Sequence, residues 1–442
     1  MVFSEVKKVV KFGGTSLANA AQFVKCAEII KSEKSRKYVV PSAPGKRFPE
    51  DTKITDMLIK CYELSAKKED FSGLFNDIKD RYNSIIRELS LNINLDDEYK
   101  IIEEAIQKGA TLDYVASRGE YLNGLILSAY IGFPFIDAKD VVFFNEKGQF
   151  DAQKTNDVMS ERLKHCENAV IPGFYGSLPD GSIKTFSRGG SDITGAIVAR
   201  AVMADIYENW TDVSGFLMCD PRIVKNPRPI KVITYRELRE LSYMGAGVLH
   251  EDSIFPVKLA GIPINIRNTN KPSDPGTMIV PAAEDYDTHD IVTGIAGKKG
   301  FAVIRIEKDM MNQEKGFGAR VLKVFADMDM SFEHLPSGID TMCVVIAHSE
   351  IKGKEKEILD NITKAVNPDN IEIETNLGLI AVVGRGMIRT PGTAYRIFKA
   401  VASENINVRM IDQGSSELNI IIGVDEKDFD RAIELIYLEF CN

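Results

Sequence analysis

Lys11-Phe12-Gly13-Gly14-Thr15-Ser16 marks the point where a strand gives way to a helix. Residues 6–12 are rich in β-branched side chains, which predicts a first strand. Residues 17–30 carry apolar side chains at helical spacing. A glycine turn between the two leaves backbone N–H groups at a helix N-terminus, where an anion is favoured and which Lys11 can also reach. The alternative for this stretch alone is an ordinary turn with an exposed lysine.

A second glycine turn, Ser187-Arg188-Gly189-Gly190-Ser191-Asp192, precedes a helical pattern at residues 193–203. Arg188 has the planar fork that suits a carboxylate. Asp192 can orient Lys11 or accept a hydrogen bond from a substrate ammonium group. The two turns therefore predict one anionic pocket built from distant parts of the chain.

A third motif, Trp210-Thr211-Asp212-Val213-Ser214-Gly215, is followed by Asp220-Pro221-Arg222. Together, in this order and spacing, the three motifs resemble the aspartate kinases of the amino-acid kinase superfamily over essentially the whole chain. The short tail after the last repeat predicts a monofunctional enzyme without a homoserine dehydrogenase domain. The resemblance implies an α/β fold: a three-layer αβα sandwich with a mainly parallel central sheet, followed by two βαββαβ domains of the ACT, ferredoxin-like type.

Composition and charge predict a cytoplasmic enzyme. The chain has 442 residues, enough for two or three domains, and a net charge of −9, which argues against nucleic-acid binding. The sequence shows no stretch long enough to span a membrane and no apolar signal core. Six scattered cysteines without a CxxC pair indicate reduced thiols rather than disulfides or zinc ligands.

Strand and helix patterns alternate through the first two thirds of the chain, which itself predicts a largely parallel sheet. Further strands are expected at 37–42, 133–137, 141–144, 169–173, 205–210 and 262–267, and a helical excursion at 55–106. Arg118-Gly119-Glu120 is expected to open a helix that ends at residue 129. A segment rich in Pro, Ser, Asn and Gly at 268–277 predicts a boundary near residue 285, so that residues 1–285 form the catalytic domain.

The last third contains an internal repeat with an offset of 392 − 316 = 76 residues, which aligns Gly316 with Gly392. Each copy reads helix, strand, glycine turn, strand and a second helix, with an apolar strand before it. We expect ACT-like domains at 286–376 and 377–442, and whether the leading strand of the first belongs to the second stays open. Family resemblance implies that edge strands pair across subunits, giving a homodimer or a dimer of dimers. A module for dimerisation alone is the alternative.

The resemblance implies the reaction ATP + L-aspartate → 4-phospho-L-aspartate + ADP, the first step of the aspartate-family (lysine, threonine, methionine) pathway, with Mg²⁺ arriving with ATP and no metal ligand from the protein. It implies these catalytic and substrate contacts: Lys11 and Asp192 at the phosphoryl group, Arg188 at the α-carboxylate, Glu120 at the α-ammonium, Thr55 at the aspartate side chain, and Gly189, Gly190 and Ser191 beside them. The implied ATP contacts are Lys11, Gly13, Gly14, Ser42, Thr211, Asp212 and Arg222. The alternatives are a solvated carboxylate at a helix start for Glu120 and a surface ion pair for Asp212 and Arg222.

In the first repeat, the resemblance implies a site for an inhibitory effector, L-lysine, with threonine as the alternative. A glycine-initiated helix offers N–H groups to a carboxylate, and an acidic side chain offers a partner to a cation. The implied effector residues are Met311, Gly316, Phe317, Gly318, Ser331, Phe332, Glu333, Ser337 and Gly338.

Two departures from the family pattern lie on the ATP side, where Gly247 replaces a frequent lysine and Leu217 replaces an aromatic residue. Lys225 or Lys258 could substitute for the missing cation. The chain has no GxxxxGK[ST], GxSxG or HExxH motif, which removes P-loop, serine-hydrolase and zincin chemistry in their usual forms. Another kinase of the superfamily, or a catalytically weak amino-acid sensor, stays open as an alternative.

Overall fold

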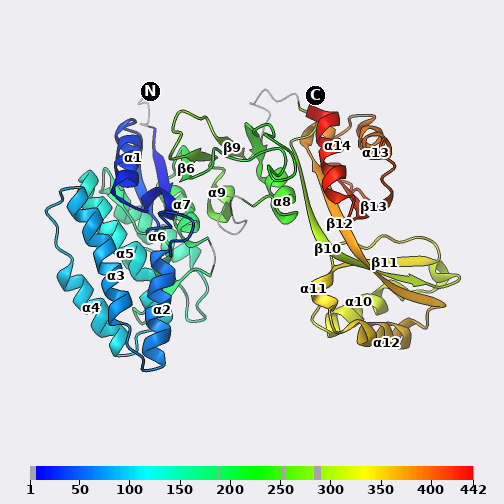
Figure 1. Cartoon of the computed structure of the whole chain (residues 1–442), viewed down its shortest axis with the longest axis horizontal. Coiled ribbons are helices and arrows are strands. Elements are labelled where there is room, and N and C mark those ends of the chain that lie inside the picture. Colours follow the sequence, from blue (N-terminus) through cyan, green and yellow to red (C-terminus); the bar gives the residue numbers. More distant parts are fainter. Residues whose placement is uncertain (1–5, 188, 248, 250–253, 283–289, 442) are drawn as a thin grey trace. The chain divides into compact units, whose positions relative to one another are not determined.

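The computed structural model describes residues 6–187, 189–247, 249, 254–282 and 290–441. The chain forms two compact units, shown in sequence colours in Figure 1. The first is drawn from residues 1–216, 231–235 and 248–286, and the second from 217–230, 236–247 and 287–442. Residues 217–230 and 236–247 thus belong to the second unit, although they precede the predicted boundary near residue 285.

A seven-stranded, mostly parallel sheet forms the centre of the first unit, in the order β3-β2-β1-β6-β8-β9-β7. Only the β8–β9 pair is antiparallel among these neighbours. The strands are β1 (Lys8–Phe12), β2 (Arg36–Pro41), β3 (Ala169–Val170), β6 (Ile206–Thr211), β7 (Val232–Thr234), β8 (Ile264–Asn268) and β9 (Thr277–Val280), with a separate hairpin of β4 (Tyr175–Ser177) and β5 (Ile183–Thr185). The α/β class and the parallel sheet are confirmed.

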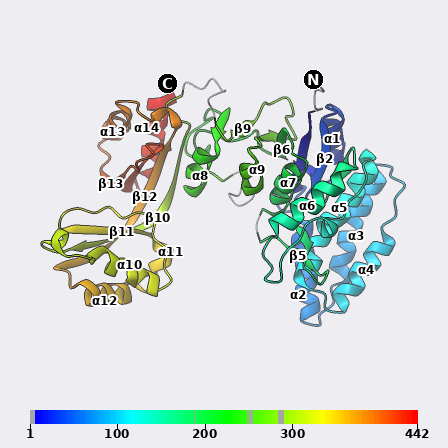
Figure 2. The ribbon, with the colours of Figure 1, turned by 180° about the vertical axis from the view of Figure 1, so that it is seen from behind.

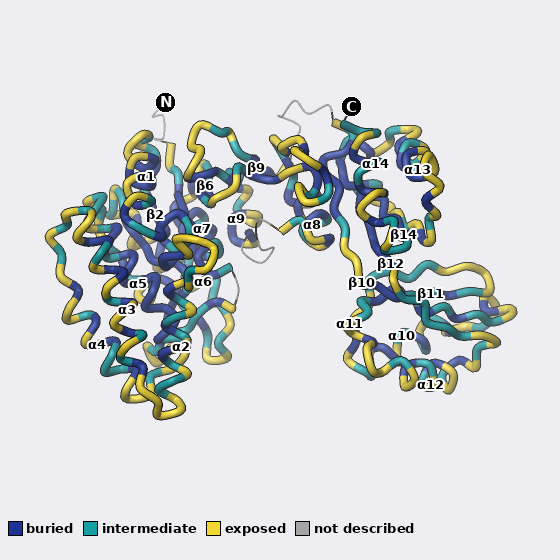
Figure 3. The backbone as a smooth tube through the Cα atoms, viewed as in Figure 1, coloured by how far each residue is buried: buried dark blue, intermediate teal, exposed yellow. Residues whose placement is uncertain are grey.

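Helices cover both faces of this sheet. One face carries α1 (Ala20–Lys31), α2 (Ile54–Ala66), α3 (Ser72–Glu88), α4 (Asp96–Gln107) and α5 (Leu112–Ile131), whose apolar sides share one buried core with β1, β2 and β6. The other face carries α6 (Ala152–Lys164), α7 (Gly190–Ala201) and α9 (Phe255–Ala260), and Figure 2 shows α6 and α7 from behind. Buried backbone follows the strands in Figure 3. No helix in the described ranges is both long and apolar enough to cross a membrane.

The second unit contains a five-stranded antiparallel sheet, in the order β11-β10-β12-β14-β13. Its strands are β10 (Gly294–Glu307), β11 (Thr341–Ala347), β12 (Asn370–Val383), β13 (Val408–Asp412) and β14 (Asn419–Asp425). Its helices are α8 (Tyr235–Tyr243), α10 (Phe317–Asp327), α11 (His348–Ile351), α12 (Glu355–Val366), α13 (Thr393–Ala402) and α14 (Phe429–Cys441), of which α8 draws all but its first residue from this unit. The expected pair of ACT-type modules is confirmed as a fold.

The two modules share their central strands. Residues 301–307 of β10 pair with 370–377 of β12, whereas residues 294–298 pair with 379–383, which also pair with β14. The pairing shifts register between the two halves. The start of β10 therefore lies within the second module, which is the alternative that the sequence left open.

Several expected elements differ in the structure. The expected strands at 133–137 and 141–144 form only isolated bridges, and Pro134 lacks the N–H that a strand needs. The helix of Glu120 starts at Leu112, because the Thr111 side chain accepts a hydrogen bond from the Tyr114 N–H and caps it there. The first repeat has bridges instead of its expected strand near 331–337, where Pro336 interrupts the run.

The α8 helix is fixed to the second module by a buried carboxylate. Glu237 accepts hydrogen bonds from the Arg385 guanidinium at 2.9 Å and from the Thr293 hydroxyl at 2.6 Å. Nearby, Asn419 donates to Glu240 at 2.6 Å. Strand β7, which directly precedes α8, is part of the sheet of the first unit, so the chain passes from one unit to the other without a linker.

A buried charge cluster holds the other side of the central strand β6. Glu208 is only 1% exposed and accepts hydrogen bonds from Arg36 Nε at 2.8 Å and Trp210 Nε1 at 2.9 Å, with Lys8 Nζ at 3.3 Å. Because Arg36 is also buried, removing the carboxylate would leave a desolvated cation without its main partner.

We predict that Glu208→Ala lowers the free energy of unfolding by about 3–5 kcal/mol in urea denaturation. Glu33→Ala is the matched control, because Glu33 pairs with the same Lys8 at 2.6 Å but its side chain is 37% exposed. The control should cost less than about 1 kcal/mol. Equal losses for the two variants would contradict this account of the cluster.

Candidate active site

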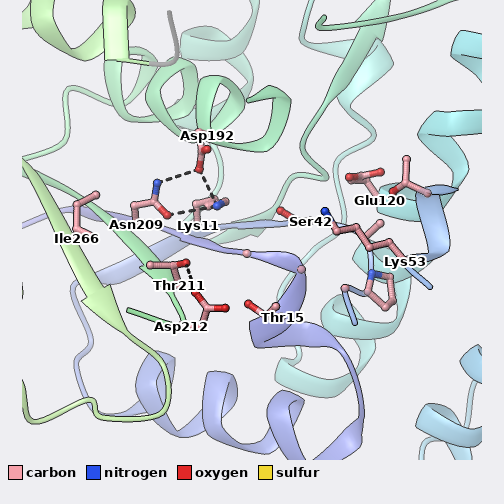
Figure 4. A pocket seen from close by; sticks show the side chains of 16 residues that line it. Lys11, Thr15, Ser42, Lys53, Glu120, Asp192, Asn209, Thr211, Asp212 and Ile266 are labelled. Carbon is pink, nitrogen blue, oxygen red and sulfur yellow. Dashed lines mark hydrogen bonds and ion pairs between the residues drawn. The ribbon is translucent and has the colours of Figure 1, made fainter. Parts of the chain in front are cut away.

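A cavity of about 410 Å³ lies in the first unit at the carboxyl ends of β1 and β6. These two strands flank the point where the strand order reverses, which is where ligands bind in open α/β sheets. Its lining residues, several of them labelled in Figure 4, are Lys11, Gly13, Gly14, Thr15, Ser42, Ala43, Pro44, Gly45, Lys53, Thr55, Glu120, Asp192, Asn209, Thr211, Asp212 and Ile266.

Three polar side chains meet at one side of the cavity. The Lys11 Nζ lies 2.6 Å from Asp192 Oδ1 and donates to Asn209 Oδ1 at 3.3 Å, and Asn209 Nδ2 donates to Asp192 Oδ1 at 2.9 Å. Lys11 and Asn209 are direct partners in the β1–β6 ladder, so their side chains leave the sheet on the same face. Asp192 comes from the first turn of α7. The structure thus brings the two glycine turns together.

The first glycine turn differs in detail from its prediction. The Gly13 N–H, an expected phosphate donor, donates to the Trp210 carbonyl at 2.9 Å in this structure, although Gly13 does line the cavity. A short 3₁₀ helix (Gly14–Leu17) follows the turn directly, and the α-helix α1 begins only at Ala20. Within the described residues the N–H groups of Gly14 and Thr15 have no hydrogen-bond partner, and both residues line the cavity. These two N–H groups can bind an anion by donating hydrogen bonds to it.

Gly14 is glycine because another loop crosses it. A Cβ at this position would lie 2.8 Å from the Ala43 carbonyl oxygen and 3.1 Å from the Gly45 Cα. The Gly45 N–H also donates to the Gly14 carbonyl at 2.7 Å. The close approach fixes the 43–45 loop, and hence Ser42 beside it, against the glycine turn.

Glu120 forms the opposite side of the cavity, in the interior of α5 rather than at a helix start. It is only 6% exposed, and burial raises the pKa of its carboxyl group to about 8, opposed by the Ala43 N–H and the Arg118 cation. Its Oε2 atom is buried and has no hydrogen-bond partner within the described part of the chain. The interpretation of Glu120 as a solvated carboxylate is therefore wrong, and the unmatched oxygen is a buried acceptor that a ligand donor can satisfy.

The other predicted contacts separate into those that reach the cavity and those that do not. Ser42, Thr55, Thr211 and Asp212 line it. Gly189, Gly190 and Ser191 lie immediately before Asp192 but are not among the lining residues, and Arg188 lies outside the described residues. Arg222 is exposed, pairs with Asp220 at 2.6 Å and does not line the cavity.

Sequence reasoning missed Asn209 and Lys53. Asn209 is a buried polar residue in a central strand, and that unusual position was an available signal. Lys53 stands just before α2, and only its proximity to Thr55 in the sequence could have suggested a role. Gly247 and Leu217, the two departures from the family pattern, do not line the cavity, and neither do Lys225 and Lys258.

The expected effector residues gather around the start of α10 and the 331–338 loop in the second unit. Gly316 has a positive φ of 78° and directly precedes α10. Phe317, the first residue of α10, and Met311 are both buried. Glu333 accepts a hydrogen bond from the Tyr243 hydroxyl, at the end of α8. Gly318, Ser331, Phe332, Ser337 and Gly338 complete the set, and Phe332 is 38% exposed.

Comparison with known proteins places the chain in a family. The profile of the amino acid kinase family matches residues 7–268, and that of an ACT domain matches residues 380–440. The chain therefore belongs to the amino acid kinase family.

Its relatives narrow the assignment to aspartokinases. Aspartokinase 3 of Bacillus subtilis (strain 168) is 39% identical over 448 residues, covering 98% of each chain. The crystal structure of Clostridium acetobutylicum aspartate kinase is 51% identical, with a TM-score of 0.91 over 99% of this chain and 100% of that one. E. coli aspartokinase III, solved with aspartate and ADP in an R-state, shares the fold at 23% identity and a TM-score of 0.74, over 99% of this chain and 100% of that one. The protein is an aspartate kinase, a phosphotransferase.

We predict that Glu120→Gln makes the ligand-free enzyme more stable at alkaline pH. In the folded protein the carboxyl pKa is about 8, above its ordinary 4.5. Between these values the folded state binds the extra proton, so this group lowers stability as pH rises. At pH 8.5 the free energy of unfolding of the variant should exceed that of the parent by up to about 5 kcal/mol, and the difference should vanish near pH 4.

Urea denaturation at a series of pH values measures this difference, and added aspartate provides the second arm. Aspartate should stabilise the parent more than the variant, because the amide oxygen can accept a hydrogen bond from an ammonium group but carries no negative charge. Parallel pH profiles for parent and variant would contradict the burial argument.

Proposed function

We propose that the cavity around Lys11 is where this aspartate kinase transfers a phosphoryl group from ATP to L-aspartate, giving 4-phospho-L-aspartate and ADP. One observation carries the proposal: the cavity holds a buried ammonium group at one side and an unmatched buried carboxylate at the other. A zwitterionic amino acid and a polyphosphate together need that arrangement of charge.

The chemistry requires neutralisation of charge rather than a base. The attacking carboxylate, with a pKa of about 3.9, is already ionised at neutral pH. Its obstacle is repulsion from the anionic γ-phosphate, which positioned cations and N–H donors relieve. Lys11 supplies the cation, Asp192 and Asn209 hold its side chain, and the N–H groups of Gly14 and Thr15 supply the donors.

On the aspartate side, the Glu120 carboxylate takes the substrate ammonium group. Binding it would supply the partner that Oε2 lacks and draw the Glu120 proton away. Thr55 and Ser42 line the wall nearby. Arg188 takes the α-carboxylate in this proposal, which rests on the sequence motif alone.

On the ATP side, Thr211 and Asp212 contact the nucleotide from the end of β6. Asp192 and Asp212, whose side chains line the cavity, would be the carboxylates available to Mg²⁺ that arrives with ATP, and the ion would supply further neutralisation of phosphate charge. Arg222 is not part of the proposal, since it pairs with Asp220 at an exposed position. The six unpaired cysteines support a cytoplasmic location.

We predict that Lys11→Met lowers kcat by about 10²–10³-fold, because it removes one preorganised cation at the transferring phosphoryl group. Lys60→Met is the control, since Lys60 is exposed on α2 and outside the cavity, and it should leave the kinetics unchanged. Acyl-phosphate formation from aspartate and MgATP measures the rate, with glutamate and N-acetylglutamate as competing substrates. Retention of full activity by the Lys11 variant would refute the proposed site.

We also propose that L-lysine inhibits the enzyme by binding the first ACT-type module, with threonine as the alternative effector. E. coli aspartokinase III, of the same fold, has been solved with lysine and aspartate in a T-state. In this chain the α10 start offers N–H groups to a carboxylate, and Glu333 offers a partner to the side-chain ammonium. The repeat places Arg409 at the equivalent position of the second module (333 + 76 = 409), where it pairs with Glu374 and Asp425 and offers no carboxylate to a cation. The edge strands β11 and β13 are the surfaces through which we propose that copies pair as a homodimer or a dimer of dimers.

We predict that Glu333→Gln raises the lysine concentration for half-inhibition about tenfold or more, because the amide loses the ion pair with the effector. Uninhibited activity should stay unchanged. Glu350→Gln, an exposed acidic residue of the same module, is the control. Initial rates across a lysine and a threonine titration measure the effect, and unaltered inhibition by lysine would exclude Glu333 as its partner.

A further inference from the structure

The loop between Gly45 and Lys53 forms one wall of the candidate active site. Gly45 and Lys53, its two ends, line the cavity, whereas residues 46–50 between them are exposed. The ends meet through a backbone hydrogen bond from the Ile54 N–H to the Pro44 carbonyl at 3.2 Å. Figure 4 shows the Lys53 side chain entering the cavity from the side of Glu120, toward Ser42. Within the described residues Lys53 has no ion-pair partner.

The outer side of this loop is also hollow. A second cavity of about 950 Å³ is lined by Arg47, Asp51 and Thr52 of the loop, and by side chains of α2 and α3. Apart from its own ends, the loop therefore has little packed protein on either side. Its position in the active-site wall must come from specific contacts rather than from burial of apolar surface.

One side chain of α3 supplies those contacts. Arg81 is 5% exposed, and its guanidinium donates to the Thr52 carbonyl at 2.8 Å and to the Gly45 carbonyl. It also lies 3.4 Å from Asp51, which Arg47 holds from the loop itself at 2.8 Å. A single planar fork thus joins both ends of the loop to the helix core, a geometry that lysine cannot reproduce.

We propose that Arg81 is a positioning residue for the kinase reaction: it holds the 45–53 loop so that Lys53 and Thr55 face bound aspartate. This inference rests on the proposed function of the cavity. Arg81 lines the outer cavity and is absent from the lining of the inner one, so it acts through the loop and not by touching substrate. Burying a guanidinium group costs desolvation free energy even when it donates to two carbonyl groups. What this arrangement provides in return is a fixed position for the loop in the cavity wall.

Arg81→Gln should raise the KM for aspartate about tenfold while kcat and the KM for ATP change less than about twofold, because ground-state positioning of one substrate is lost. Arg87→Gln is the matched control: it lies on the same helix, lines the same outer cavity and is exposed, and it should leave all constants unchanged. Arg81→Lys should fall between parent and Arg81→Gln, since one donor point replaces the fork.

Two further measurements separate positioning from a general loss of stability. In the background of Lys53→Met, Arg81→Gln should raise the aspartate KM less than it does in the parent, because the side chain that the loop presents is already gone. Hydrogen exchange followed by mass spectrometry should show faster exchange in residues 45–55 of Arg81→Gln, with the strands of the sheet unchanged. Should Arg81→Gln not fold, Arg81→Lys carries both measurements.

An unchanged KM for aspartate, full additivity with Lys53→Met, or unaltered exchange in the loop would overturn the inference while leaving the proposed site standing. Failure of the proposed function is seen separately, as full activity of Lys11→Met, and does not depend on any Arg81 variant. A uniform loss of activity and stability in Arg81→Lys, with no effect specific to aspartate, would assign Arg81 a structural role only.

Discussion

The ion pair between Lys11 and Asp192 is the interaction on which the rest of the first unit depends. A buried ammonium group is tolerated only with a close partner, and this partner arrives on a helix far along the chain. The pair fixes α7 against β1, and Asn209 on the neighbouring strand completes the set. On the opposite face of β6, Glu208 binds Arg36 in the same manner. Adjacent residues of one strand, Glu208 and Asn209, therefore belong to a buried charge cluster and to the cavity wall respectively.

The two ionisable walls of the cavity differ in the partners that they have. Lys11 lies close to the Asp192 carboxylate and the Asn209 amide oxygen. Glu120 has only the Ala43 N–H and a nearby cation to oppose desolvation, so its carboxyl pKa is high. An unsatisfied group of this kind destabilises the empty site and favours a ligand that supplies the missing charge. An ammonium group is one such ligand, which is why the proposed site assigns Glu120 to the substrate nitrogen.

The sequence was sufficient for the glycine turns, the parallel sheet and the tandem modules, because each depends on local patterns of glycine, apolar spacing or repetition. It was insufficient where a distant contact decides the outcome. Gly14 was attributed to phosphate binding, yet the crossing 43–45 loop also requires it. The sequence pattern predicts a helix start at Glu120, whereas the cap at Thr111 begins the helix at Leu112. Arg81 gave no signal at all, since an arginine within an amphipathic charged helix ordinarily faces solvent.

The continuous strand β10 passes through both regulatory modules, with its first half in the second module and its remainder in the first. Neither module can therefore be excised as an independent domain, because the two share this strand. An engineer who wishes to transplant the effector response of one enzyme into another has to move at least the stretch from the start of β10 to α14 as a single block, together with α8, whose Glu237 binds Arg385 of that block.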